Sequence, residues 1–120
     1  MLEKQDFVTR AFLVNLRVNN NSGENQLEET EFNQLAKSGR MQVVGSVSFV
    51  IDHRKVSPKY LIRKGQLSKL LLLLADQEVE VVVFNYDISA SQQKNLENFF
   101  WVVSEVTGGT QTPPVLPLGH

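Results

Sequence analysis

The 120-residue sequence contains no cysteine, so neither a disulfide nor thiolate chemistry is available to it. Histidine is scarce: His53 and the terminal His120 do not have the spacing of a zinc site. Long apolar runs are missing, because the longest, residues 70–75, is far too short to span a bilayer. The charged N-terminus is not typical of a signal peptide. The length of 120 residues fits one domain, and these absences favour a cytoplasmic protein with no metal site and no membrane binding.

Motifs of nucleotide-binding enzymes are absent as well. The sequence has no G-x-x-x-x-G-K-[ST] phosphate loop, and no G-x-G-x-x-G follows an expected strand. The Asp52–His53 pair, with a serine such as Ser57 or Ser89, could suggest a hydrolase triad. Adjacent strand residues point to opposite faces, however, and no nucleophile-elbow pattern surrounds either serine. We therefore expect no catalytic residues and no cofactor in this chain.

Acidic residues are missing from one stretch, residues 53–75, which we call the basic segment. It carries six of the twelve Lys and Arg residues and none of the thirteen Asp and Glu residues. The rest of the chain holds six basic and thirteen acidic side chains, a net charge of −7, although the whole chain is nearly neutral. Such an uneven distribution attracts polyanions over about a Debye length, roughly 8 Å at physiological salt.

The basic segment predicts a polyanion-binding site, with RNA as the favoured ligand. Pro58 and Tyr60 lie among the charges, and an aromatic ring can stack on a base while cations bind phosphates. Arg63 and Lys64 precede an expected helix, whose first N–H groups favour anions. An ordinary solvated face is the alternative interpretation. The candidate RNA-binding residues are Arg54, Lys55, Lys59, Tyr60, Arg63, Lys64 and Lys69.

The apolar pattern alternates between strand-like and helix-like segments. It predicts strands at residues 11–18, 43–51, 79–84 and 101–103, with a possible short one at 60–62. Helices are expected after Asn25, from Gly65 to Gln77 and after Ser89. We infer an α/β fold: a single small domain with a mostly parallel sheet of four to five strands, flanked by about three helices.

Capping residues mark two of these helices and composition marks the tail. Asn25 is expected to cap the first helix with Glu28 as its reciprocal partner, and Ser89 with Gln92 forms a capping box for the third.

Residues 107–120 hold three of the four prolines and show no periodicity. The predicted boundaries are therefore a domain at residues 1–106 and a disordered tail at 107–120.

Three stretches of the chain match motifs of a known family. These are SPKYLIRKGQ at residues 57–66, VVVFNYDISASQQKNLE at 81–97, and EFNQLAKSG at 31–39 followed by VVG at 43–45. They resemble P-x-x-Y-[IF]-G-x-G-K, V-V-F-D-x-x-L-S-P-x-Q-x-R-N-L-E and E-F-x-x-L-A-x-S-A-G…V-V-G in the N-terminal domain of HflX-type, ribosome-associated GTPases. The similarity runs from about Ala11 to Val103, in the same order and spacing.

The resemblance implies a function in ribosome binding, with large-subunit rRNA as the expected partner and no DNA sequence recognition. GTP and Mg²⁺ would belong to a GTPase domain, which the sequence lacks and which could be a partner, so no GTP hydrolysis is implied for this chain. The chain departs from the family pattern at Arg63, which replaces Gly, at Gln66, which replaces Lys, at Ala90, which replaces Pro, and at residues 104–106, which replace D-R-T.

Two alternative functions stay open at this point. A small ligand-binding or enzymatic domain would use the crevice at the C-terminal ends of the strands, the usual site in open α/β sheets. The chain could also be a truncated remnant of a GTPase, without retained activity.

Overall fold

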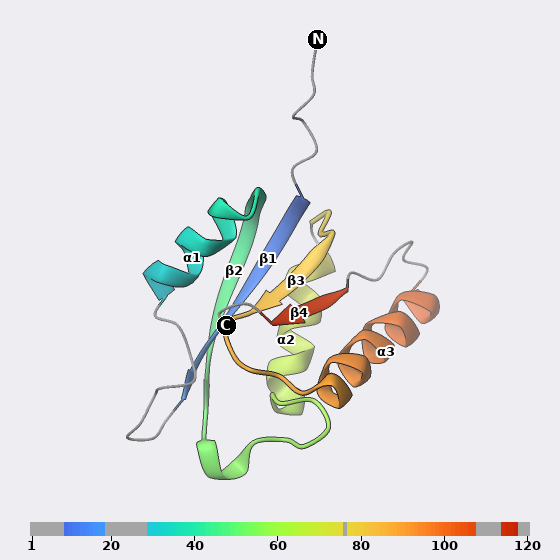
Figure 1. Cartoon of the computed structure of the whole chain (residues 1–120). Coiled ribbons are helices and arrows are strands. Elements are labelled where there is room, and N and C mark those ends of the chain that lie inside the picture. Colours follow the sequence, from blue (N-terminus) through green and yellow to red (C-terminus); the bar gives the residue numbers. More distant parts are fainter. Residues whose placement is uncertain (1–8, 19–28, 76, 108–113, 118–120) are drawn as a thin grey trace.

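Strands and helices alternate along the chain in the computed structural model, which describes residues 9–18, 29–75, 77–107 and 114–117. The strands form one sheet in the order β2-β1-β3-β4, and every adjacent pair is parallel. Figure 1 shows the arrangement, which confirms the predicted α/β class. The elements are β1 (Thr9–Val18), α1 (Glu29–Ser38), β2 (Met41–Ile51), the 3-10 turn η1 (His53–Lys55), α2 (Lys64–Ala75), β3 (Val81–Phe84), α3 (Ala90–Thr107) and β4 (Val115–Pro117).

The buried parts of the two central strands are almost wholly apolar because helices cover both faces of the sheet. β1 is buried from Ala11 to Leu16, and all of β3 is buried. A continuous apolar run, rather than an alternating one, is what a strand covered on both faces requires. β1 pairs with β2 over its whole length, with one bulge between Ala11 and Phe12.

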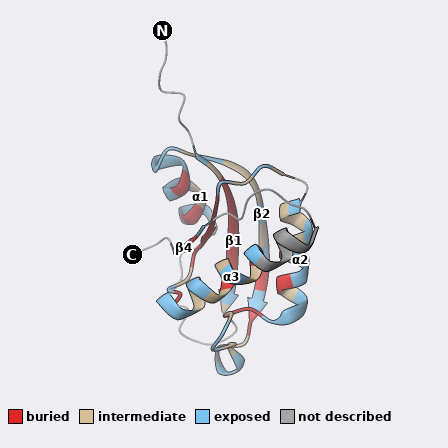
Figure 2. Ribbon diagram, turned by 90° about the vertical axis from the view of Figure 1, so that its right-hand side faces the viewer, coloured by how far each residue is buried: buried red, intermediate tan, exposed pale blue. Residues whose placement is uncertain are grey.

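The helices lie on opposite faces: α1 covers one face, and α2 with α3 covers the other (Figures 1 and 2). The smaller core, on the α1 side, joins Phe32 and Ala36 of the helix to Leu13 and Val83 of the sheet. The larger core, on the side of α2 and α3, contains Phe12, Val14, Leu16, Phe49, Ile51, Leu61, Ile62, Leu67, Leu70, Val82, Phe84, Ile88, Leu96, Phe100 and Val115.

The strand predicted at residues 101–103 is wrong, because α3 continues through it to Thr107. Short apolar runs fit a strand and a buried helix equally well by pattern alone. No turn residue separates Phe100 from Trp101, so the helix already begun has no signal to end there. The possible strand at 60–62 is also absent, and only an isolated antiparallel bridge joins Ser57 to Leu61.

The tail prediction is wrong for the residues that the structure describes there. Val115–Pro117 form β4, which pairs with β3, and Val115 is fully buried. The N–H of Val82 donates to the carbonyl O of Pro114 at 2.9 Å, and the N–H of Val115 donates to the Glu97 carboxylate at 2.9 Å. Proline is tolerated in a strand at a sheet edge, which is where β4 lies.

The predicted helix starts have different outcomes. At α3 the capping box is confirmed: the N–H of Gln92 donates to the Ser89 hydroxyl and the N–H of Ser89 donates to Gln92 Oε1, both at 3.0 Å. Asn25 and Glu28, the predicted cap of the first helix, lie outside the described residues.

No helix in the described part of the chain combines the length and apolarity that a bilayer span requires.

Candidate polyanion-binding face

The first two cations of the basic segment stand on the 3-10 turn η1, directly after β2. Asp52 caps this turn: its side chain accepts a hydrogen bond from the N–H of Arg54 at 2.9 Å, and its carbonyl accepts one from the N–H of Lys55 at 2.8 Å. The side chains of Arg54 and Lys55 are exposed. Asp52, which sequence analysis considered only as part of a possible triad, therefore fixes the turn that presents both cations.

Lys59 and Tyr60 lie in a tight loop that closes on Ser57. The N–H of Leu61 donates to the carbonyl O of Ser57 at 2.9 Å, and the N–H of Tyr60 donates to the Ser57 hydroxyl at 3.0 Å. Leu61 has a φ of 70° although it is buried. A left-handed conformation costs a non-glycine residue about 1–2 kcal/mol, so burial of the leucine and the loop hydrogen bonds must offset this strain.

Helix α3 holds this loop through two amide side chains. Gln92 Nε2 donates to the carbonyl O of Ser57 at 3.0 Å, and Asn95 Nδ2 donates to the carbonyl O of Lys59 at 3.1 Å. Gln92 thus serves both the capping box and the loop. Sequence analysis missed this second role, because residues 35 and 36 positions apart become neighbours only in the folded chain.

Arg63 and Lys64 stand at the start of α2, where Gln66 organises the backbone. The N–H of Arg63 donates to Gln66 Oε1 at 3.0 Å, while Gln66 Nε2 donates to the carbonyl O of Val50 at 2.9 Å. The first turn of α2 contains no acidic residue. A Cβ at Gly65 would meet nothing within 4 Å, so the start of the helix opens to solvent there.

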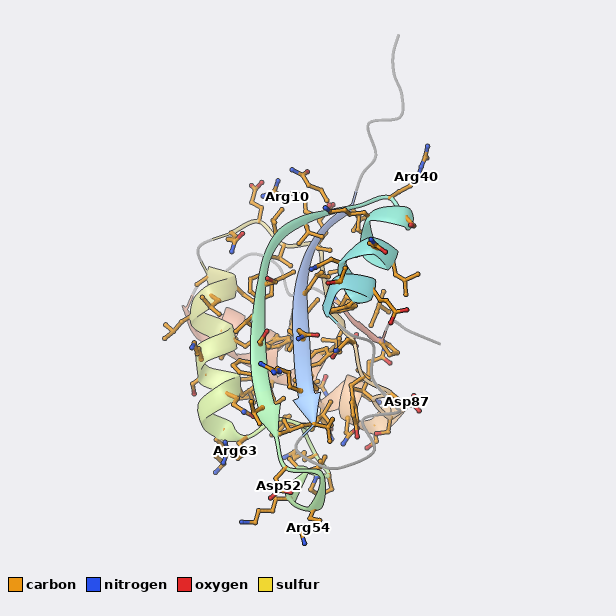
Figure 3. All side chains as sticks on the ribbon, turned by 90° about the vertical axis from the view of Figure 1, so that its left-hand side faces the viewer. Arg10, Arg40, Asp52, Arg54, Arg63 and Asp87 are labelled. Carbon is orange, nitrogen blue, oxygen red and sulfur yellow. The ribbon has the colours of Figure 1, made fainter. Side chains whose placement is uncertain are left out.

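The structure brings most of the candidate residues to the end of the sheet where the strands terminate. Figure 3 shows Arg54 and Arg63 pointing away from the protein at this end, with Arg10 and Arg40 at the opposite end. Lys69 stands further along α2, about 7.5 Å in axial rise beyond Lys64. Arg54, Lys55, Lys59, Arg63, Lys64 and Lys69 are all exposed, and we call these six cations the basic face.

Tyr60 does not offer an open ring to a ligand. Its ring packs edge-on against Phe99, with the centroids 5.7 Å apart, and the ammonium Nζ of Lys59 lies 5.3 Å from its centroid. The side chain is half-buried against the larger core. Tyr60 is therefore placed to support the loop and to hold Lys59, rather than to stack freely on a base.

The crevice at the strand ends, the alternative site, is occupied by two asparagines. The chain passes from β1 to β2 on one side and then crosses over to β3 on the other side of β1. The topological switch point therefore lies between β1 and β3. There the N–H of Leu16 donates to Asn85 Oδ1 at 2.8 Å, and Asn85 Nδ2 donates to the carbonyl O of Leu16 and to Asn15 Oδ1. The Asn85 amide thus continues the β3 ladder beyond Phe84. Asn15 and Asn85 are 4% and 2% exposed, so these polar groups serve the fold.

The serines considered for a triad are engaged in backbone capping. The Ser57 and Ser89 hydroxyls accept the N–H groups of Tyr60 and Gln92. This geometry supports the structural interpretation of both serines. Among the described residues, no three His, Cys, Asp or Glu side chains gather as a metal site would require.

Comparison with known families decides the affiliation. The model of the family described as GTP-binding GTPase N-terminal matches residues 24–106, more than half of the chain. The chain belongs to this family. The predicted resemblance to the N-terminal domain of HflX-type proteins is thereby confirmed.

A curated relative indicates how much of a longer protein this domain represents. The chain is 31% identical over 93 residues to the GTPase HflX of Alkalihalophilus pseudofirmus. That match covers 78% of the chain but 22% of the relative, so the chain spans about a fifth of the relative's length. Strand β4 lies beyond the segment that matches the GTP-binding GTPase N-terminal family.

Proposed function

We propose that this domain is a non-catalytic binding module that binds RNA phosphates through the basic face. The target is large-subunit rRNA of the ribosome, which places the domain in the cytoplasm. Any GTP and Mg²⁺ chemistry belongs to a separate GTPase domain, either a further part of the same protein or a partner. The observation that carries the proposal is the exposure of six cations on a segment without a single acidic side chain.

The position of Arg63 and Lys64 argues against a purely structural origin of these charges. Cations at a helix N-terminus oppose the helix dipole, at a cost of about 0.3–1 kcal/mol each when exposed. Acidic side chains would stabilise the start of α2, yet its first turn has none. The positive potential of the helix end adds to that of the two side chains, which is the arrangement that a phosphate group favours.

The loop that carries Lys59 is held in place before any ligand binds. Gln92 and Asn95 fix its carbonyl groups, and Tyr60 packs on Phe99 beneath it. A pre-ordered loop loses less conformational entropy on binding than a free one. Tyr60 therefore contributes indirectly, by keeping Lys59 at the surface.

A salt series of RNA binding tests the proposal. If about four cations contact phosphates, the logarithm of the binding constant should fall with log[salt] at a slope of about −3 to −4. Replacing Arg63 and Lys64 together by Ala should reduce the magnitude of the slope by about two. Filter binding with ribosomal RNA and with an unrelated RNA of equal length measures both slopes and any preference for the ribosomal sequence.

The matched control removes two cations outside the basic face. Lys37 on α1 and Lys94 on α3 are both exposed, and their replacement by Ala changes the net charge by the same amount. The control should retain the wild-type slope and the wild-type thermal midpoint, since exposed charges contribute little to stability. Indistinguishable slopes for the two double variants would show that binding depends on net charge alone, and would refute the basic face as the site.

A further inference from the structure

One face of helix α3 lies against the loop formed by residues 57–61. Gln92, Asn95 and Phe99 are spaced three and four residues apart, so they share one side of the helix. In the same order they contact three residues of the loop, which are Ser57, Lys59 and Tyr60. The helix therefore holds the loop at three successive points.

Lys59 is restrained at both of its ends. Its carbonyl O accepts a hydrogen bond from Asn95 Nδ2 at 3.1 Å, and its ammonium Nζ lies 5.3 Å from the ring centroid of Tyr60. A cation within about 6 Å of a ring centroid is attracted by the quadrupole of the ring. The ring is itself fixed by Phe99, with the centroids 5.7 Å apart. Lys59 is thus held in place although its side chain is exposed.

The other five cations of the basic face are held through the backbone alone. The N–H groups of Arg54 and Arg63 donate to the side chains of Asp52 and Gln66. In the described part of the chain, no hydrogen bond or ring contact restrains the charged ends of these five side chains. A free lysine or arginine side chain loses rotamer entropy when it binds, so a restrained cation contributes more affinity per charge.

The loop depends on support from outside, because its backbone is strained. Leu61 has a φ of 70°, a conformation that is unfavourable for a residue other than glycine. The carbonyl O of Ser57 accepts two hydrogen bonds, from the N–H of Leu61 at 2.9 Å and from Gln92 Nε2 at 3.0 Å. One of the two bonds that close the loop therefore comes from α3.

We propose that Lys59 is the anchoring cation of the basic face, the one that contributes most to RNA affinity, and that Gln92 and Asn95 are positioning residues that fix it for a phosphate group. This inference rests on the proposed function and deepens it. The salt slope counts the phosphate contacts, whereas the affinity at one salt concentration also includes the entropy lost on binding. The two measurements together separate an anchoring cation from an ordinary one.

Two single variants compare the anchoring cation with an ordinary one. Lys59→Ala and Lys55→Ala each remove one exposed cation, and each should reduce the magnitude of the salt slope for ribosomal RNA by about one. At one fixed salt concentration, however, Lys59→Ala should weaken binding about threefold more than Lys55→Ala. Filter binding measures both quantities.

A double-mutant cycle tests the role of Asn95. Asn95→Ala removes the hydrogen bond to the carbonyl of Lys59 without changing a charge, and should weaken RNA binding about threefold. The same substitution should have no further effect in a Lys59→Ala background and its full effect in a Lys55→Ala background. Gln34→Ala, which removes an exposed amide from α1, is the matched control and should retain wild-type affinity.

Amide hydrogen exchange gives a readout without RNA. Gln92→Glu keeps an oxygen that accepts the N–H of Ser89, but it loses the donor to the carbonyl O of Ser57. The N–H of Leu61, which donates to the same carbonyl, should then exchange faster, and RNA binding should weaken. Ser91→Glu adds the same charge at an exposed position of the same helical turn and should leave this exchange rate unchanged.

Three results would overturn the inference and leave the basic face as the binding site. They are equal affinities of Lys59→Ala and Lys55→Ala, an Asn95→Ala effect that persists without Lys59, and an exchange rate of Leu61 that Gln92→Glu does not change. A wild-type salt slope in the variant that lacks Arg63 and Lys64 would refute the proposed function and this inference with it. Circular dichroism verifies that folded proteins are compared. The two lysine variants lose only exposed side chains, so they test the inference even if an amide variant unfolds.

Discussion

The two edges of the sheet differ in length, chemistry and support. β2 has eleven residues without charge or proline, while β4 has three and ends at Pro117. Residues of β2 with exposed side chains alternate along the strand, whereas β4 buries a single residue, Val115. The long edge is secured by its extended pairing with β1, and the short one depends on β3, α3 and Val115.

This difference shows how a sheet edge can be closed or left open. A short strand with proline offers few N–H groups to a newcomer, so β4 ends the sheet. β2 offers a longer row of outward backbone groups, of which Gln66 engages one carbonyl. A short strand that ends in proline closes the sheet, whereas β2 interrupts its longer row of outward backbone groups with the bulge opposite Ala11 and Phe12.

The largest effect is expected at the short edge. Val115→Asp places a charge at a fully buried position and should lower the free energy of unfolding by about 3 kcal/mol or more. Leu116→Asp, at the neighbouring position that is 40% exposed, should cost far less. Urea unfolding of both variants measures the difference. Equal, small effects would mean that β4 contributes little to stability, as would be expected of a disordered tail.

A smaller difference in the free energy of unfolding is expected between variants of the sheet interior and variants of the β2 edge. Asn85→Ala leaves the buried N–H and C=O of Leu16 without their amide partner, which should cost about 2–4 kcal/mol. Gln66→Ala removes a comparable amide from the carbonyl of Val50, but water can replace it there, so the cost should be about 0.5–1 kcal/mol. Chemical denaturation provides both values. Similar costs would show that the β2 edge is shielded from water.

The third prediction concerns the bulge in β2. A Cβ at Gly45 would lie 2.8 Å from Phe12 Cε2 and 2.8 Å from Gln77 Nε2. Gly45→Ala should therefore destabilise the protein by about 1–3 kcal/mol through overpacking. Gly65→Ala meets open space in α2 and should instead stabilise by up to about 1 kcal/mol. Thermal midpoints that move in the same direction would contradict the close packing of β2 on β1.

Much of this architecture could be predicted from local sequence. The apolar runs of β1 and β3 and the start of α3 after Ser89 both reflect patterns within one segment. The end of α3 could not be predicted, because the residues at 101–103 fit a helix as well as a strand. Choosing between them requires knowing which segment fills the position beside β3.

The candidate site divides in the same way. Its charges are visible in the sequence, and their exposure agrees with that expectation. The hydrogen bonds that hold the Lys59 loop could not be predicted from the sequence. Gln92 and Asn95 look like ordinary helix residues in the sequence, and only the fold brings their amides to the carbonyl groups of this loop. Asn15 interrupts an apolar strand and Asn85 follows one, which is the signal that could have indicated a buried amide pair.

The sequence by itself determined the order of strands and helices as far as the start of α3, the capping box and the separation of basic from acidic residues, since each depends on neighbours along the chain. Tertiary structure alone decided that Val115 rather than Trp101 lies beside β3, that Tyr60 packs on Phe99, and that β2 is an edge. Segments far apart in the chain compete to cover the same buried surface. Local periodicity does not indicate which segment will cover it, so these outcomes depend on the whole fold.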